Sequence, residues 1–190
     1  MVQKALHLRR QGLRRPRWFL FAILLLLAAA AAADLLEGRV VRIADGDTLT
    51  VLDGDRVQHR VRLAGIDAPE KAQPFGERSK QNLARLVAGK PVEVHWHKRD
   101  RYGRVVGQVW VVSPDARCQG AGCPKTLDAG LAQVTVGLAW HYKQYAGEQS
   151  EEDRERYSFA EIEARARRAG LWREGDPVAP WEWRRMRPSW

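Results

Sequence analysis

The stretch that decides the fold runs from Asp45 to Glu70 and reads DGDTLTVLDGDRVQHRVRLAGIDAPE. It carries acidic residues at both ends, Asp45 and Asp47 at the start and Asp67 and Glu70 at the finish. The residues between them have the character of two β-strands joined by a turn, so we expect a hairpin to bring the two ends back together. The stretch therefore predicts one acidic cluster built from two separate corners of the chain.

Three local patterns predict this hairpin. Residues 48–52 are rich in β-branched side chains, which favour strands. Residues 53–55 read Asp-Gly-Asp, a strong turn signal. From residue 57 to residue 63 apolar and polar side chains alternate, which indicates a strand with one buried face and places Arg62 on the opposite face. The alternation leaves the Arg62 guanidinium free to join the acidic cluster.

The rest of the chain predicts a small α+β domain. Alternation and turn residues indicate five strands, at residues 36–43, 48–52, 57–63, 92–97 and 105–112. Helical spacing of apolar residues indicates three helices, at residues 74–88, 127–138 and 150–169. This order favours a five-stranded OB-type β-barrel with three helices. We divide the chain into a leader (1–33), a folded domain (34–173) and a Trp/Pro/Arg-rich tail (174–190), which we expect to be irregular.

The formal net charge of +9 is unevenly spread along the chain. Residues 1–33 contain six basic residues and no acidic one, so residues 34–190 carry a net charge of +3. A mildly basic domain is compatible with a nucleic-acid partner but does not predict one by itself.

The leader has the pattern of a targeting segment. Its basic part is followed by the uncharged run 18–33, whose sixteen residues end in three alanines. That run is shorter than the roughly 20 residues needed to span a bilayer, and its small-residue end favours a cleaved signal peptide. An uncleaved membrane anchor is the alternative, and a buried soluble helix fits least because the run has no polar face. We expect the protein to be secreted or periplasmic, or anchored to the membrane and facing outward.

The chain has two cysteines, Cys118 and Cys123, both located after the leader. In an exported protein such a closely spaced pair favours a disulfide, which would close a small glycine-containing loop. Free thiols are the second interpretation. A zinc site fits poorly, because two cysteines provide only half of a tetrahedral ligand set and no histidine lies nearby.

The acidic cluster predicts a site for a hard cation. Asp47 and Asp67 offer carboxylates, and Pro69 restricts the backbone so that the carbonyl of Ala68 can serve as a further oxygen ligand. No thiol or histidine crowds these positions, which disfavours a soft metal. Asp and Gly also dominate ordinary turns, so the first acidic element alone would be read as a turn. The second acidic element after the hairpin is what favours a cation site.

Three more side chains complete a possible site for phosphodiester cleavage. Glu70 beside a bound cation would stay ionised and could accept a proton from water. Arg62 and Arg104 could grip phosphate oxygens, because a guanidinium matches them with two parallel hydrogen bonds. Taken singly, Glu70 would be read as a helix-start glutamate and each arginine as a surface residue.

The combination resembles a known family. DGDT at 45–48, RLAGIDAPE at 62–70 and YGR at 102–104 together resemble the staphylococcal nuclease (thermonuclease) family, over about Gly38 to Trp172. The resemblance implies an OB barrel with three helices and calcium-dependent hydrolysis of DNA and RNA phosphodiesters that leaves 3′-phosphate ends.

Carried over to this chain, the resemblance implies specific roles. Ca²⁺ would be held by the carboxylates of Asp47 and Asp67 and the carbonyl of Ala68. Arg62, Glu70 and Arg104 would be the catalytic residues, with Glu70 acting on the attacking water. Tyr102 matches a tyrosine near the nucleotide. Apart from the resemblance, Tyr142 could border the substrate cleft and stack on a base, or it could pack in the core or at its rim.

Two further questions stay open at the level of sequence. The tryptophans Trp172, Trp181, Trp183 and Trp190 could stack on single-stranded nucleic acid, or the first three could fasten the tail to the barrel. The protein could also be a nucleic-acid-binding module that has lost turnover, with or without a membrane tether. Such a module needs neither Glu70 nor both arginines, so their presence favours the enzyme. Nothing in the sequence demands more than a monomer.

Overall fold

The computed structural model describes residues 34–186 of the 190-residue chain. The predicted leader, residues 1–33, lies outside the described residues, as do residues 187–190 of the predicted tail. In the described part of the chain, no helix combines the length and apolar character needed to cross a membrane.

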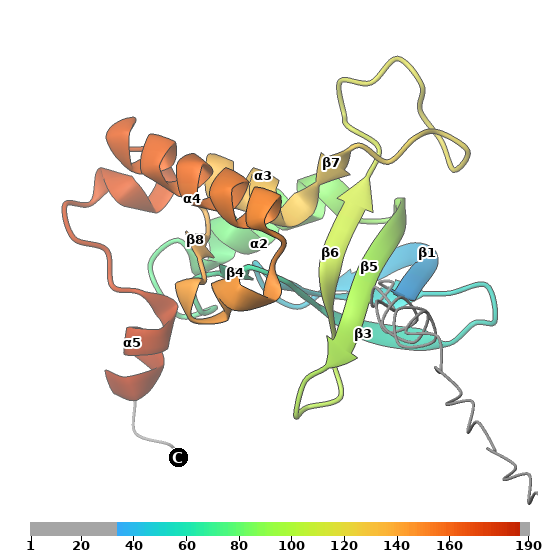
Figure 1. The fold of residues 1–190 in the computed structure, drawn as a ribbon, viewed down its shortest axis with the longest axis horizontal. Coiled ribbons are helices and arrows are strands. Elements are labelled where there is room, and N and C mark those ends of the chain that lie inside the picture. Colours follow the sequence, from blue (N-terminus) through green and yellow to red (C-terminus); the bar gives the residue numbers. More distant parts are fainter. Residues whose placement is uncertain (1–33, 187–190) are drawn as a thin grey trace, which may run out of the picture. The chain divides into compact units, whose positions relative to one another are not determined.

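Five strands form a closed barrel, as predicted (Figure 1). They are β1 (Asp34–Ile43), β2 (Thr48–Leu52), β3 (Gln58–Leu63), β5 (Pro91–Arg99) and β6 (Val105–Val111). The hydrogen-bonded order is β3-β2-β1-β5-β6, and parallel pairing of β3 with β6 closes the circle. A barrel without open edges satisfies the backbone groups of all its strands, which explains how so short a chain supports this sheet.

Alternating side chains give the barrel its core. In β3, Val61 and Leu63 are buried and Arg62 between them points to the other face, as the sequence pattern predicted. In β6, every second residue from Val105 to Val111 is buried. These side chains join those of β1, β2 and β5 and of the packed helices in one hydrophobic core.

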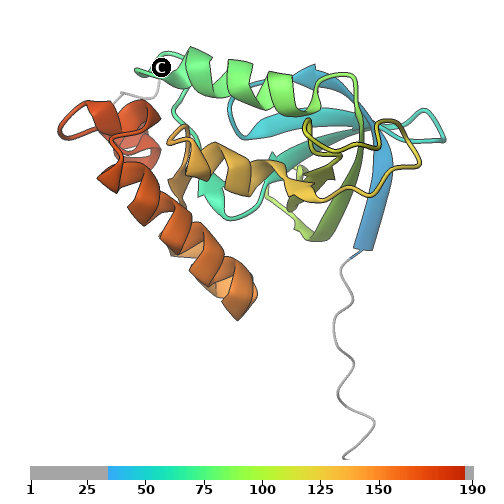
Figure 2. The same cartoon turned by 90° about the horizontal axis from the view of Figure 1, so that it is seen from above.

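Three helices cover the barrel at the predicted places, and Figure 2 shows them on one side of it. They are α2 (Gly76–Val87), α3 (Ala129–Thr135) and α4 (Glu151–Ala166). Helix α2 begins two residues later than predicted, because Phe75 adopts a left-handed backbone conformation with φ of 66°. Two 3₁₀ helices, η1 (Lys143–Glu148) and η2 (Gly170–Arg173), flank α4.

Four short elements were not expected from the sequence. Strands β4 (Ile66–Asp67) and β8 (Trp140–His141) pair with each other, and β7 (Leu127–Asp128) pairs with β6. Helix α5 (Pro180–Met186) follows η2, so the prediction of an irregular tail was wrong for these residues. In Figure 1, α5 lies apart from α4, at the lower left of the molecule.

Tryptophans fasten this tail to the domain, one of the two interpretations open at the level of sequence. Trp140, Leu171 and Ala179 form a second small buried cluster, and Trp172 and Trp181 pack against it. The rings of Trp172 and Trp181 meet Trp140 edge-on, at centroid distances of 5.3 and 6.4 Å. Such contacts between large aromatic rings give α5 a defined position.

Candidate active site

The two acidic corners of the chain meet at one guanidinium. Arg62 donates from Nη1 to Oδ2 of Asp47 and from Nη2 to Oδ1 of Asp67, each at 2.9 Å. The hairpin makes this possible because Thr48 pairs with Arg62 across β2 and β3, and Leu63 N donates to Asp47 O at 2.8 Å. The structure thus brings Asp47, Asp67 and Arg62 together, as expected from the folded hairpin.

The backbone around this cluster is tightly packed. Ala68 N donates to Asp47 Oδ2 at 3.1 Å, which locks the second acidic corner onto the first. Gly46 allows the close approach, since a Cβ there would lie 1.9 Å from Ser79 Oγ on α2. Asp67 belongs to β4 and pairs with Trp140 of β8. This pairing holds the Asp67 backbone in place.

Negative charge is crowded here. Burial raises the pKa of Asp67, and the charge of Asp47 adds to the effect, while two arginines oppose it. Burial and then the charge of Asp47 raise the pKa of Asp45 to about 6. The sequence showed Asp45 as an acid without assigning it a role, and the structure makes it a third carboxylate beside the pair. A cation would relieve this repulsion.

Glu70 lies at the rim of the cluster. Its backbone N–H donates to Gln73 Oε1 at 3.1 Å, and Gln73 N donates back to Glu70 O at 2.8 Å. Gly76 lets the turn close against α2, because a Cβ there would lie 2.0 Å from Glu70 O. The Glu70 side chain is 41% exposed, so water reaches its carboxylate.

Arg104 approaches the cluster from the β5–β6 turn. Its Nε donates to Asp100 Oδ2 at 2.7 Å, and its Nη1 lies 3.4 Å from Thr48 Oγ1. Thr48 in turn donates to Asp47 Oδ1 at 2.8 Å, so Arg104 is linked to the acidic pair through one hydroxyl. Tyr102 is exposed and its ring lies 5.5 Å from Arg104 Cζ. The structure thus places Tyr102 beside Arg104 rather than on the carboxylates.

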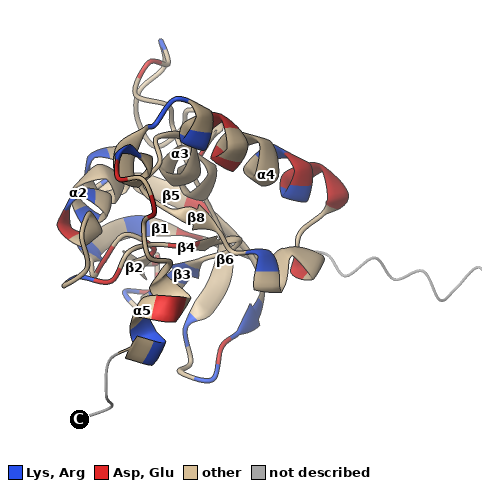
Figure 3. Cartoon of the chain, turned by 90° about the vertical axis from the view of Figure 1, so that its left-hand side faces the viewer, with Lys and Arg blue, Asp and Glu red and all other residues tan. Residues whose placement is uncertain are grey.

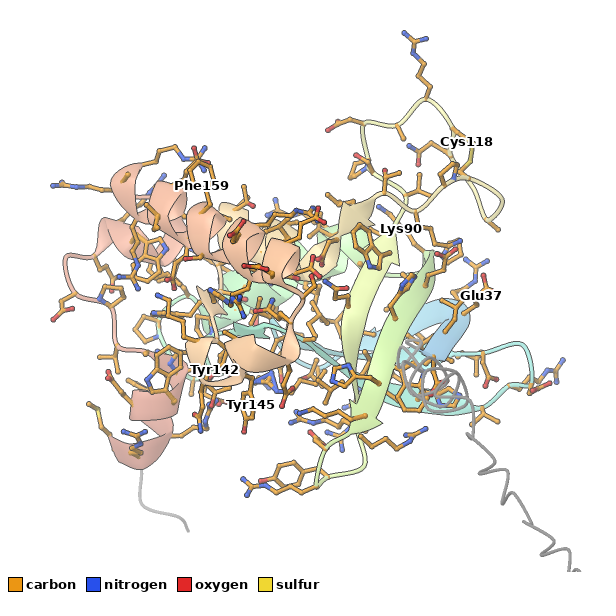
Figure 4. All side chains as sticks on the ribbon, viewed as in Figure 1. Glu37, Lys90, Cys118, Tyr142, Tyr145 and Phe159 are labelled. Atoms are coloured by element: carbon orange, nitrogen blue, oxygen red, sulfur yellow. A yellow bond between two sulfur atoms is a disulfide. The ribbon has the colours of Figure 1, made fainter. Side chains whose placement is uncertain are left out.

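Tyr142 borders the cluster on its other side. Arg62 Cζ lies 5.9 Å from the centre of the Tyr142 ring, and the ring of Trp181 is stacked on Tyr142 at 5.4 Å with an angle of 9°. Tyr145 meets Tyr142 edge-on at 5.0 Å. Figure 4 shows the two labelled tyrosines side by side. Aromatic surface therefore lies next to Arg62, where a base of a bound nucleotide would need it.

Arg184 of α5 is part of the site, and no sequence pattern pointed to it. Its Nη2 donates to Asp67 Oδ2 and its Nη1 to Glu70 Oε1, both at 2.7 Å. Nη1 also lies 3.3 Å from Asp67 Oδ1. A third guanidinium therefore reaches the acidic cluster from the chain's C-terminal part, and Figure 3 shows the basic residues of α5 in blue at the lower end of the helix.

The donor set suits a hard cation. Asp47, Asp67 and the Ala68 carbonyl are all oxygen donors, which Ca²⁺ and Mg²⁺ prefer. Within residues 34–186, no three side chains of Asp, Glu, His or Cys are grouped closely enough to form a complete metal site. A cation would therefore use the two carboxylates together with backbone and water oxygens. The crowding of negative charge at Asp45, Asp47 and Asp67 fits such an occupant.

The two cysteines lie elsewhere. Cys118 and Cys123 are joined by a disulfide with an S–S distance of 2.00 Å. Their loop projects from the end of β6, and Figure 4 shows Cys118 on it, far from Tyr142. The disulfide therefore stiffens a peripheral loop and takes no part in the cluster of charges.

Comparison with known proteins identifies the family. The profile described as Staphylococcal nuclease homologue matches residues 60–174. The chain is 42% identical over 165 residues to a protein named micrococcal nuclease from Shigella flexneri, covering 86% of this chain and 88% of the relative. It is 41% identical over 149 residues to a protein from Escherichia coli named as an uncharacterized endonuclease, covering 78% and 85%. With the barrel, the paired carboxylates and the arginines in place, the chain belongs to the family of staphylococcal nuclease homologues.

Proposed function

We propose that this protein is an exported, Ca²⁺-dependent nuclease that hydrolyses phosphodiester bonds of DNA or RNA and leaves 3′-phosphate ends. The observation that supports it most is the meeting of Asp47 and Asp67 on the guanidinium of Arg62, with Glu70 at the open rim. A binding module needs positive charge and aromatic surface, but it has no use for a buried carboxylate pair with a solvent-exposed glutamate beside it.

The residues of the site divide the reaction between them. Asp47, Asp67 and the carbonyl of Ala68 would hold the cation, which would supply Lewis-acid stabilisation of charge on the phosphate. Glu70 accepts a proton from the water whose oxygen attacks phosphorus, the bond to the 5′-oxygen breaks, and that oxygen takes a proton from solvent to leave as a hydroxyl. Arg62 and Arg104 bind non-bridging phosphate oxygens and stabilise the extra negative charge of the transition state. Tyr102 and Tyr142 contact the flanking nucleotide.

Export is supported by the sequence and by the disulfide. The basic start and uncharged run of residues 1–33 have the pattern of a signal peptide or a membrane anchor. The Cys118–Cys123 disulfide suits an oxidising compartment. Mass determination of the protein purified from its host would show whether residues 1–33 have been removed.

The first experiment tests metal dependence and product chemistry. Protein starting at Asp34 is incubated with single- and double-stranded DNA and RNA, with Ca²⁺, with Mg²⁺ or with EGTA and EDTA. We expect cutting with Ca²⁺, none with the chelators, and 3′-phosphate ends on the products. Cutting in the chelators would contradict a metal-dependent reaction, and binding without cutting under every condition would favour the module.

The second experiment tests the role of Glu70. Glu70→Gln should lower kcat by about 100-fold or more, because a general base contributes on that scale, and should leave oligonucleotide affinity within about twofold. Glu77→Gln is the matched control, since Glu77 lies exposed in the first turn of α2 and, within residues 34–186, its side chain accepts a hydrogen bond from Gln81 alone. An equal loss of affinity in Glu70→Gln would assign Glu70 a binding role instead.

A further inference from the structure

Arg184 occupies the carboxylates that the proposed function assigns to the cation and to catalysis. It binds both oxygens of Asp67 and one oxygen of Glu70. Asp67 is almost fully buried, with its side chain 1% exposed, and Arg62 already holds Oδ1. A cation that takes Asp67 as a ligand therefore meets the positive charge of Arg184 bound to the same carboxylate.

Of the two arginines on Asp67, Arg184 is the one that can leave. The Arg62 side chain is 16% exposed and bridges two carboxylates from within a barrel strand. The Arg184 side chain is 43% exposed and stands on a seven-residue helix. Exposed ion pairs exchange their partners for water at small cost, whereas removing Arg62 from its two partners leaves buried charge uncompensated.

The chain holds Arg184 at the site through contacts before it. Gln73 Nε2 donates to Val178 O at 2.6 Å, and Gln73 Oε1 accepts from Glu70 N, so one side chain ties the tail to the Glu70 turn. Trp181 is stacked on Tyr142 and packs against the cluster around Trp140. These anchors keep the guanidinium at a high local concentration near Asp67 even after it detaches.

From this arrangement we propose that Arg184 is a tethered counter-ion that competes with the divalent cation for the acidic cluster. The inference rests on the proposed function and concerns the regulation of the same site. When Arg184 is docked, it offsets part of the negative charge and occupies Asp67 and Glu70. When it swings into solvent, these carboxylates can bind metal. The apparent metal affinity is then the intrinsic affinity reduced by the fraction of molecules in which Arg184 is undocked.

Metal affinity measured without nucleic acid tests the proposal directly. Ca²⁺, Mg²⁺ and Mn²⁺ are titrated by calorimetry into wild-type protein, Arg184→Gln, Arg184→Lys and Arg185→Gln. Arg185 is the matched control, because it is the next residue on α5, is exposed, and has no ion-pair partner within residues 34–186. Melting curves in EDTA verify that each variant is folded.

We expect Arg184→Gln to bind the cation about three- to tenfold more tightly than wild type, the scale of a partly exposed ion pair with two hydrogen bonds. The metal affinity of Arg184→Lys should fall between those of wild type and Arg184→Gln, because lysine keeps the charge but cannot make two parallel hydrogen bonds. The metal affinity of Arg185→Gln should match that of wild type. The Ca²⁺ concentration for half-maximal cutting should fall by the same factor in Arg184→Gln.

Other results would overturn the inference. Equal affinity in Arg184→Gln and wild type would show that Arg184 does not compete, and weaker affinity would show that it organises the site for metal. If neither wild type nor Arg184→Gln bound a cation, there would be no metal for Arg184 to compete with, and the inference would be refuted. Tighter metal binding in Arg184→Gln with no cutting by any of the proteins would uphold the inference and refute the proposed function. Normal cutting with unchanged metal affinity in Arg184→Gln would uphold the proposed function and refute the inference.

Discussion

Two buried carboxylates in this protein have opposite surroundings. Asp67 in β4 and Asp128 in β7 are both nearly inaccessible, with 1% and 3% of their surface exposed, and burial raises the pKa of each. Asp67 is held by the guanidinium groups of Arg62 and Arg184. Asp128 is held by neutral donors, namely Tyr157 Oη at 2.8 Å and the backbone N–H groups of Gly130 and Leu131.

The different hydrogen-bond partners of the two aspartates distinguish a carboxylate with a structural role from one that is available for function. Asp128 caps the start of α3 and ties α4 to it through Tyr157, so its partners are fixed by the fold. The partners of Asp67 are long cationic side chains, and one of them stands on the exposed helix α5. Cations on side chains can be replaced by a metal ion, while backbone donors cannot move away. A buried carboxylate with exchangeable partners is therefore the better indication of a reactive site.

The largest effect is expected from the same substitution at both positions. Asp67→Asn should lower kcat/KM by about 100-fold or more, because in the proposed function Asp67 is a charged ligand of the cation, and the change also removes a partner of Arg62. At temperatures where Asp128→Asn is folded, its kcat/KM should stay within about threefold of the wild-type value. Its free energy of unfolding should be lower than that of wild type by about 1–3 kcal/mol. Kinetics and urea unfolding of both variants measure the contrast. A similarly large loss of kcat/KM in folded Asp128→Asn would contradict the contrast between the two aspartates.

A smaller effect is expected at the partner of Asp128. Tyr157→Phe removes one hydroxyl donor from a buried carboxylate and should lower the free energy of unfolding by about 1–3 kcal/mol, with kcat unchanged. Phe159→Tyr is the control, since Phe159 is 63% exposed and lies on the same helix, α4, where Figure 4 labels it. We expect it to change stability by less than about 0.5 kcal/mol. If Tyr157→Phe were neutral in urea unfolding, Asp128 would not depend on this donor.

The smallest effect concerns pH. Burial raises the pKa of Asp128 in the folded protein above its ordinary value. The folded state therefore holds this proton more tightly than the unfolded state, and the resulting stability is present at low pH and lost as the pH rises through the folded pKa. The advantage of wild type over Asp128→Asn should shrink as the pH rises above the ordinary carboxyl pKa of about 4. Melting temperatures of the two proteins across this rise in pH measure it, and an advantage that grows with pH would contradict the assigned shift.

Much of the barrel and of the site could be predicted because local patterns carry them. Alternation in residues 57–63 gave the buried face of β3 and the outward direction of Arg62, and the structure confirms both. The pairing of β4 with β8 could not be predicted, because two-residue strands have no periodicity. Helix α5 was missed for a similar reason: its seven residues are too few to show a helical repeat, and its position depends on the tryptophan cluster.

By itself, the sequence determined that a hairpin would return Asp67 to Asp47 with Arg62 beside them, because turn residues and period-two alternation act over a few neighbouring positions. Only the tertiary structure decided that Arg184 would bind Asp67 across 117 positions of chain. That contact depends on where the aromatic cluster places α5 on the folded domain. No pattern among neighbouring residues encodes it, since packing between distant segments is set only once the barrel and helices are formed.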